Sequence, residues 1–288
     1  MPGMRARLEG LARIDRRYVF LVIAVAVLLP FVAPIELRPE PSEETLRFRD
    51  ALDRAIRSPK PIVVELAFGN QTMSEMEPIA LAVMHKLFHD KKPVIFLTTY
   101  ETAAAFTRRY LAAMEKRYQL EYGEDYVFLG YAAAYTVAMY KLGTSIEEVY
   151  HEDDRGTPLR KLPIMKGVER LADVSAVIDI AANANPEHWI NYAVTPFGVD
   201  FLMASTAVLA TDWFPYLQTG QVKGLIAGGR AGAELEGLLV DEGVLERTGD
   251  ATRGLGSLSL ALVVILGFIV VGNIGYFAGR RGPKGRGA

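Results

Sequence analysis

The stretch PIVVELAF, Pro61 to Phe68, decides the fold, because it is apolar along its whole length except for Glu65. Strands that are continuously apolar are buried on both faces, which is typical of a parallel sheet covered by helices. Similar stretches predict four further strands, at residues 93–99, 126–130, 176–182 and 199–204. The sequence therefore predicts a buried sheet with strands from much of the chain.

The segments between these strands have the capping residues and the spacing of apolar residues that are typical of helices. Helices are predicted at residues 74–89, 101–122, 132–142 and 186–192, and one at residues 43–57 precedes the first strand. Alternation of strands and helices predicts an α/β domain with a three-layer, Rossmann-like or flavodoxin-like, mostly parallel sheet. The order of the strands stays open.

Polar side chains follow the predicted strands, where an open α/β sheet usually binds its ligand. The candidate ligand-binding residues are Asn70, Thr99, Tyr131, Asp179, Asn183, Ser205 and Thr206. Most are uncharged, which favours a small neutral or zwitterionic ligand held by hydrogen bonds and stacking. The alternative is that these residue types only turn the chain and cap helices.

Two acids interrupt apolar strands, Glu65 in PIVVELAF and Asp179 in AVIDIAA. A buried carboxyl group must be paired, hydrogen-bonded or protonated, so each is either functional or a local strut. Asp179 is the better functional candidate because it lies nearer the end of its strand. It would be the acid or base if the domain were an envelope hydrolase or transferase.

His85 and His89 are four residues apart and share one helix face, so they are the weak candidates for a metal site. A zinc motif of the HExxH type requires Glu after the first His, and Lys86 stands there. The sequence also contains no GxSxG, SxxK or P-loop motif. We therefore predict neither a metal nor a cofactor, and no catalytic residue beyond the weak alternative of Asp179.

The segment from Gly220 to Gly237 is rich in glycine. Gly224, Gly228 and Gly232 recur every four residues and predict a smooth stripe on one helix face. Such a stripe permits close approach of the domain's own sheet, a neighbouring protomer or a partner membrane protein. These glycines are therefore predicted interface residues.

Two apolar stretches without ionisable residues, Val19 to Ile35 and Leu255 to Phe277, are long enough to predict transmembrane helices at residues 18–35 and 255–278. A signal peptide is the alternative for the first, but no small-x-small cleavage site follows it. In the second, Gly275 and Gly279 form a small-xxx-small pair suited to helix association.

Arginines flank the two stretches on their outer sides. The positive-inside rule places basic tails 1–17 and 279–288 in the cytoplasm. A linker and juxtamembrane helix at 36–60 and an α/β domain at 61–250 would then be periplasmic or extracellular, with the protein in the cell's inner membrane. Expected partners are the lipid bilayer, further copies of the chain or other membrane proteins, and a small polar ligand.

The chain has 32 basic and 34 acidic residues and a net charge of −2, which favours no nucleic-acid partner. It has no cysteine, which excludes disulfides, thiolate metal sites and cysteine nucleophiles. The domain must therefore be held together by its core alone.

The layout of two terminal helices and a central α/β domain, with the strings EYGEDYVFLGY and TGQVKGLIAGGRAGAELEG, resembles uncharacterised bacterial envelope proteins. In layout alone it also resembles membrane-tethered sensors or auxiliary subunits of transport systems. The resemblance implies a Rossmann-like extracytoplasmic domain and a membrane-anchored binding or assembly module. It implies no catalytic residues.

Overall fold

The computed structural model describes residues 15–33, 38–133 and 135–280. The chain divides into two compact units. Residues 38–252 form the α/β domain, and the terminal regions 1–37 and 253–288 form the other unit.

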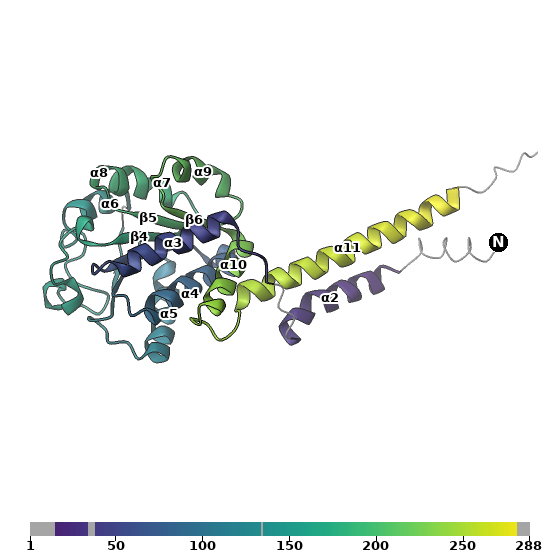
Figure 1. Ribbon diagram of the computed structural model, residues 1–288, viewed down its shortest axis with the longest axis horizontal. Helices are drawn as coiled ribbons and strands as arrows, with labels where there is room; N and C mark the ends of the chain where they lie inside the picture. Colours follow the sequence, from purple (N-terminus) through teal and green to yellow (C-terminus); the bar gives the residue numbers. More distant parts are fainter. Residues whose placement is uncertain (1–14, 34–37, 134, 281–288) are drawn as a thin grey trace, which may run out of the picture. The chain divides into compact units, whose positions relative to one another are not determined.

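The α/β domain contains a six-stranded sheet in which every neighbouring pair is parallel (Figure 1). Its strands are β1 (Ile62–Ala67), β2 (Val94–Thr98), β3 (Tyr126–Tyr131), β4 (Ala176–Ala181), β5 (Phe201–Ser205) and β6 (Gly224–Ala227). The order β3-β2-β1-β4-β5-β6 is the Rossmann order, with two halves that diverge from the centre. The predicted α/β parallel sheet is confirmed, and the order selects the Rossmann-like arrangement over the flavodoxin-like one.

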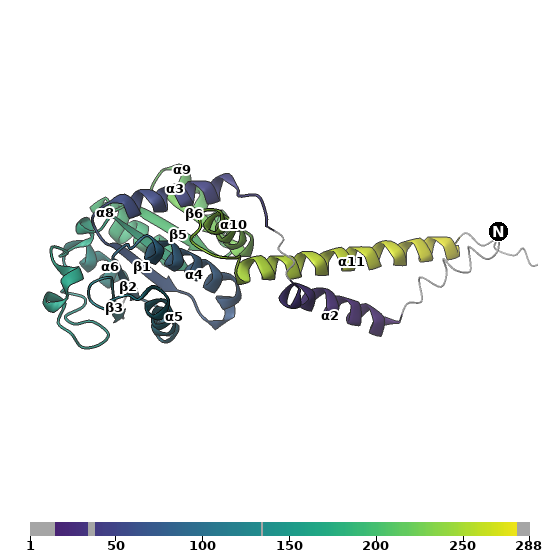
Figure 2. The ribbon, with the colours of Figure 1, turned by 60° about the horizontal axis from the view of Figure 1, so that its bottom comes forward.

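Helices cover both faces of the sheet (Figure 2). Face A packs against α3 (Glu43–Arg57), α4 (Met73–His89), α5 (Ala103–Tyr118) and α10 (Gly228–Asp241). Face B packs against α6 (Tyr135–Thr144), α7 (Asn185–Trp189), the π-helical η5 (Ile190–Val194), α9 (Ala210–Gln218) and the 145–174 loop. Short helices are η1 (Asn70–Thr72), η2 (Leu159–Lys161), η3 (Pro163–Met165), η4 (Leu171–Asp173) and α8 (Thr195–Phe197). Successive strand residues alternate between the faces, so the strands are largely apolar, with Glu65 in β1 and Asp179 in β4 as the buried acids.

The predicted glycine stripe on one helix is wrong, because a sixth strand and a helix divide the segment. Gly224 begins β6, Gly228 begins α10 with φ of +81°, and Gly232 lies inside α10. A Cβ on Gly224 would lie 2.7 Å from the Cα of Phe48 in α3. One on Gly232 would lie 3.0 Å from Ile79 and 3.2 Å from Ala251. Two of these glycines thus let the domain's own helices pack closely.

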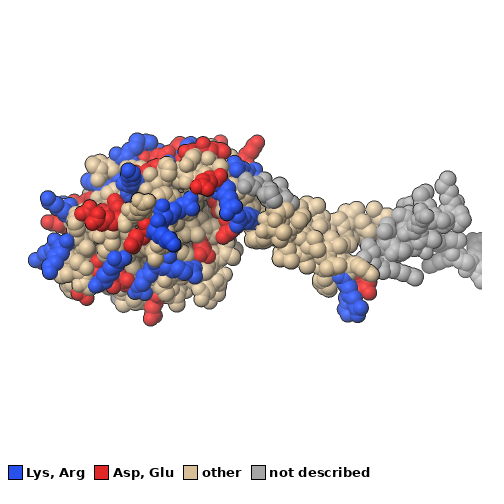
Figure 3. Space-filling view, turned by 90° about the horizontal axis from the view of Figure 1, so that it is seen from below, with Lys and Arg blue, Asp and Glu red and all other residues tan. Residues whose placement is uncertain are grey.

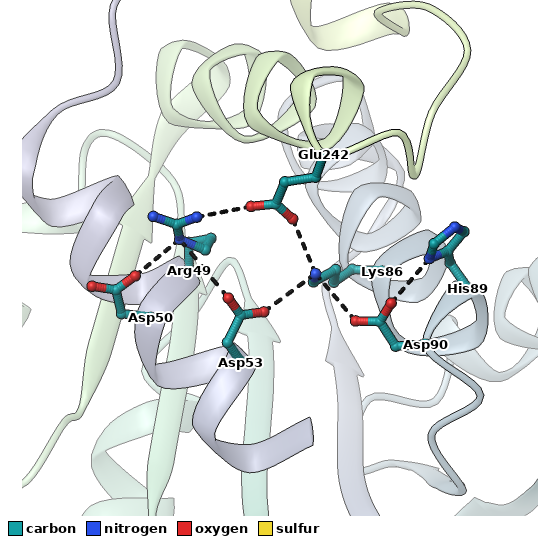
Figure 4. Close-up of polar contacts among 7 residues, drawn as sticks. All are labelled: Arg49, Asp50, Asp53, Lys86, His89, Asp90 and Glu242. Carbon is teal, nitrogen blue, oxygen red and sulfur yellow. Dashed lines mark hydrogen bonds and ion pairs between the residues drawn. The ribbon is translucent and has the colours of Figure 1, made fainter. Parts of the chain in front are cut away.

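A network of ion pairs joins α3, α4 and α10 on face A (Figure 4). At its centre, Lys86 Nζ lies 3.3 Å from Asp53, 3.1 Å from Asp90 and 3.0 Å from Glu242. Arg49 adds contacts of 2.9 Å with Glu242 and Asp50 and 4.0 Å with Asp53, and His89 contacts Asp90 at 2.9 Å. Two cations therefore bridge four carboxylates between the three helices.

The terminal unit contains α2 (Arg16–Val32) and α11 (Asp250–Arg280), of which the first three residues belong to the α/β domain. Among the described helices, α11 alone is long and apolar enough to cross a membrane, over Asp250–Phe277. The first predicted span corresponds to the 17-residue α2, while residues 34 and 35 lie outside the described residues. Ser257 Oγ donates to the carbonyl of Val27 at 2.9 Å, so the two helices are in contact.

The two units differ in surface charge. Figure 3 shows basic and acidic side chains interspersed over the visible face of the α/β domain, whereas the described parts of α2 and α11 show few charges. Large apolar side chains are exposed instead, including Phe20, Leu21, Leu262, Val263 and Leu266. Exposed apolar surface of this kind is typical of a contact with a membrane or with another protein.

Candidate functional site

The two acids of the apolar strands lie side by side at the centre of the sheet. Glu65 of β1 and Asp179 of β4 are partners in the parallel register, and both side chains are fully buried. β1 and β4 are the strands from which the two halves of the sheet diverge. Open α/β sheets bind ligands outside the carboxyl ends of the strands at this topological switch point. The acid pair is therefore the candidate site.

Glu65 is surrounded by donors. Its Oε1 accepts hydrogen bonds from the Thr99 backbone N–H at 2.7 Å and from Thr99 Oγ1 at 2.5 Å. Its Oε2 accepts from Asn185 Nδ2 at 2.9 Å and from Trp189 Nε1. Burial raises the pKa of Glu65, while these donors oppose the shift. Four donors suit an ionised carboxylate, so we assign the negative charge of the pair to Glu65.

Asp179 has a much poorer set of partners. Asn185 Nδ2 lies 3.4 Å from Oδ1 and 3.3 Å from Oδ2. Burial raises the pKa of Asp179 well above its usual range, and the charge of Glu65 raises it further. Two adjacent buried carboxyl groups cannot both ionise cheaply. Asp179 is therefore the protonated member of the pair at neutral pH.

The site is closed by face B elements. Asn185 and Trp189 both come from α7, and Trp189 is fully buried. Tyr150, from the 145–174 loop, is 5% exposed, and its hydroxyl has no hydrogen-bond partner. Burial raises the pKa of Tyr150 strongly, and the charge of Glu65 adds to this. The arrangement anchors α7 to the central strands, and it leaves Asp179 without contact to solvent.

The predicted ligand-binding residues do not form one pocket. Only Thr99, which follows β2, and Asp179, which lies inside β4, belong to the acid pair and its hydrogen-bond partners. The others are separate. Asn70 and Tyr131 are exposed, and Thr206 is 6% exposed. Asn183 Oδ1 accepts a hydrogen bond from the Asn185 backbone N–H at 2.9 Å, and the fully buried Ser205 accepts one from Trp213 Nε1 at 3.1 Å. For Asn183 and Ser205 the local role in turns and packing explains the contacts seen.

The two candidate metal-ligating histidines have other partners. His85 Nδ1 is hydrogen-bonded to Tyr118 OH at 2.8 Å, and His89 Nδ1 is hydrogen-bonded to Asp90 at 2.9 Å. Burial, and to a lesser extent the charge of Arg117, lowers the pKa of His85 to about 4. Over the described ranges, no group of three or more His, Cys, Asp or Glu residues could hold a metal ion.

Two cavities lie away from the acid pair. One of about 310 Å³ adjoins the carboxyl ends of β5 and β6, where Thr45, Ala207 and Ala227 are among its lining residues. The other, of about 540 Å³, lies between the end of α6 and the 145–174 loop, and Ile146, Arg160 and Glu169 contribute to its lining. The predicted ligand-binding residues line neither.

Sequence reasoning found the acids and, among the polar residues that follow the strands, Thr99 and Asn185, but it missed Trp189 and Tyr150. Trp189 was recognisable only as part of a short helix, and Tyr150 lies in a long loop with mixed charge. The two acids in apolar strands predict that hydrogen-bond donors surround them, because buried carboxyl groups need partners from elsewhere in the chain. They do not predict which residues supply those donors.

Comparison of the chain with protein-family models, with curated proteins and with solved structures found no match.

Proposed function

We propose that this protein is a membrane-anchored binding or assembly module, with an α/β domain tethered by its terminal helices to the cell's inner membrane. The observation that carries the proposal is the apolar surface of α11, on which Leu262 is 50% and Val263 66% exposed. Leaving such side chains in water is unfavourable, at about 25 cal/mol for each Å² of apolar surface. A bilayer, or a partner's transmembrane helices, would remove that cost.

The proposed topology places both termini in the cytoplasm and the α/β domain outside it. It is supported by Arg13, Arg16 and Arg17 before the first apolar stretch and by Arg280 and Arg281 after the second. The proposed anchors are the first apolar stretch, which contains α2, and α11. The uncleaved N-terminal stretch is part of this proposal.

Absence of native cysteine permits a direct test of the topology. Glu124→Cys places one thiol on the exposed surface of the α/β domain, and Arg286→Cys places one in the C-terminal tail. In spheroplasts, a membrane-impermeant maleimide should label the Glu124→Cys chain at once and the Arg286→Cys chain only after lysis. Equal labelling before lysis would contradict the topology, and recovery in the soluble fraction would contradict anchoring.

The binding or assembly role is supported by the closed acid pair, because buried Asp179 cannot contact a substrate in this structure. The proposed partners are a second copy of the chain or another membrane protein. Gly275 lies in α11 and is buried, whereas the surroundings of Gly279 lie outside the described residues. Native mass spectrometry of the detergent-extracted protein should show a homo-oligomer or a stoichiometric partner. A monomer without any bound component would contradict the assembly role.

A further inference from the structure

The cavity of about 310 Å³ lies at the carboxyl ends of β5 and β6, and most of its lining residues are apolar. They include Ala207 after β5, Ala210 and Phe214 in α9, and Ile226 in β6. Open α/β sheets usually bind ligands beyond the carboxyl ends of their strands. Pockets for small molecules measure about 300–1,000 Å³, so a cavity of this size suits a small ligand with an apolar part.

Charged side chains of opposite sign line the same cavity. Glu44 comes from the first turn of α3, and Arg230 comes from the first turn of α10. Arg230 Nε donates to Glu234 Oε1 at 2.8 Å, which leaves the N–H groups of both Nη atoms able to donate to a ligand. No described residue forms a hydrogen bond or ion pair with the Glu44 carboxylate. The cavity therefore presents a carboxylate to a cation and a guanidinium group to an anion.

Glu234 of α10 positions both charged groups. It is 2% exposed, and its second carboxylate oxygen, Oε2, accepts from Ser42 Oγ and Thr45 Oγ1, each at 2.7 Å. Burial opposes the ionisation of Glu234, but these donors and Arg230 hold its pKa below the ordinary value. Because Thr45 follows Glu44 in α3, one buried carboxylate holds both Arg230 and the first turn of α3 beside the cavity.

We propose that this cavity binds a small zwitterion with an apolar side chain, in the chemical class of the aliphatic and aromatic α-amino acids. The ligand carboxylate accepts from the Nη groups of Arg230, and the ligand ammonium group donates to Glu44. The ligand side chain packs against Ala207, Ala210 and Phe214. The proposal names a ligand class for the proposed binding role and rests on that role.

A ligand with a single charge satisfies only part of this lining. An anion at Arg230 shares the cavity with the Glu44 carboxylate, and a cation at Glu44 shares it with the guanidinium group. Like charges brought close together are unfavourable. A zwitterion brings an opposite charge to each group, and charge-assisted hydrogen bonds are roughly twice as strong as neutral ones.

Isothermal titration calorimetry of the full chain in phosphatidylcholine nanodiscs tests the ligand class. Leucine is compared with leucinamide, which lacks the carboxylate, with N-acetylleucine, which lacks the ammonium group, and with glycine, which lacks the apolar side chain. Each of these three probes should bind about tenfold more weakly than leucine, because each loses one of the three contacts. Equal affinity for leucine and any one of them would overturn the proposal, and so would the absence of binding by leucine, valine and phenylalanine.

Arg230→Gln and Glu44→Gln should each weaken leucine binding about tenfold, because each removes one charged partner of the ligand. Arg160→Gln and Glu43→Gln are the matched controls and should leave the affinity unchanged. Arg160 also forms an ion pair through Nε, with Glu147 at 2.7 Å, but it lines the other cavity, and Glu43 is exposed and lines neither. Unchanged affinity in either site variant, or a loss in Arg160→Gln, would overturn the proposal.

Ala210→Phe tests the cavity without changing either charged group, because the larger side chain fills the space proposed for the ligand. It should abolish leucine binding, and a cooperative urea transition would verify that this variant and the others are folded. A folded Ala210→Phe chain that binds leucine with native affinity would overturn the proposal.

Incorporation into nanodiscs separates this proposal from membrane anchoring. An incorporated chain that binds none of the three amino acids would overturn the ligand site and leave anchoring intact. A chain that is not incorporated but binds leucine in solution would contradict anchoring and support the ligand site.

Discussion

The two faces of the sheet accommodate their carboxyl groups in different ways. On face A, the carboxylates of Asp53, Asp90 and Glu242 surround Lys86, which is 8% exposed (Figure 4). On face B, Glu65 and Asp179 are fully buried, and their recorded partners are neutral donors. Face A pairs its carboxylates with cations, whereas face B uses hydrogen bonds and a retained proton. Stability at the two faces should therefore respond differently to mutation and to pH.

The largest expected effect comes from the acceptor at the centre of face B. Glu65→Gln replaces one accepting oxygen with an N–H₂ group, so Asn185 Nδ2 or Trp189 Nε1 faces a donor. Unsatisfied buried donors cost about 1–3 kcal/mol each, so we expect a loss of about 3 kcal/mol in unfolding free energy. Urea unfolding of the detergent-solubilised chain, followed by tryptophan emission, measures it, because both tryptophans lie in the α/β domain.

Glu101→Gln is the matched control, since Glu101 is an exposed glutamate after β2. It should change the unfolding free energy by less than ~0.5 kcal/mol. Hydrogen exchange in α7 should accelerate in Glu65→Gln and not in the control. If Glu65→Gln unfolds like the native chain, the donors around Glu65 do not hold α7 on the sheet.

The next largest loss of stability is expected from a substitution on face A. Lys86→Met removes the central cation and leaves three carboxylates close together. Removing one partner of a fully buried ion pair costs roughly 3–5 kcal/mol, but Asp53, Asp90 and Glu242 are partly exposed and Arg49 remains. We therefore expect a loss of about 2 kcal/mol, also by urea unfolding.

Adding Glu242→Gln to Lys86→Met should restore part of that loss, because it removes one of the repelling charges. Lys116→Met, on the exposed surface of α5, should be nearly neutral. A double variant that is less stable than Lys86→Met would show that Glu242 acts through Arg49 rather than through Lys86.

The sequence predicted the components of face B better than their arrangement. Five strands, the parallel sheet and both buried acids followed from continuous apolar stretches. The adjacency of Glu65 and Asp179 did not, because it depends on strand order, and local patterns do not encode which distant strands pair. β6 was missed because it has only four residues, and its first, Gly224, is explained by the approach of Phe48.

Face A was less predictable still. In the sequence, Lys86 is only the residue that stands where a zinc motif requires Glu. Its ion pairs with Asp53 and Glu242 follow only once α3 and α10 are placed beside α4. Helical spacing predicts which residues share a face but not which helix covers it.

A smaller effect distinguishes the two members of the acid pair. The folded pKa of Asp179 is raised, so the folded chain keeps a proton that the unfolded chain releases. This group's contribution therefore falls as pH rises from the unfolded pKa toward the folded one. Asp179→Asn mimics the protonated carboxyl group, so its stability relative to the native chain should increase between pH 4 and pH 8.

Urea unfolding across that pH range, in both chains, measures this difference. A decline in the relative stability of Asp179→Asn with rising pH would place the proton elsewhere. Glu65→Gln, by contrast, should be less stable than the native chain at every pH in this range. That result would confirm that one carboxyl group is neutral and the other charged.

The smallest effect concerns His85 on face A, which is neutralised by burial and not by an acid. Its folded pKa is about 4, below the ordinary value of 6.5, so the unfolded chain binds the proton more tightly. Its contribution is complete above about pH 6.5 and is lost as pH falls toward 4. His85→Gln should flatten this decline in urea unfolding at pH 7, 6 and 5, while His89→Gln, at a side chain 44% exposed, should not. Because the slope of His85 is opposite in sign to that of Asp179, the two contributions partly cancel in the native chain. His85→Gln and Asp179→Asn should therefore shift the slope of the profile in opposite directions, with the double variant between them, and shifts of the same sign would refute the assignments.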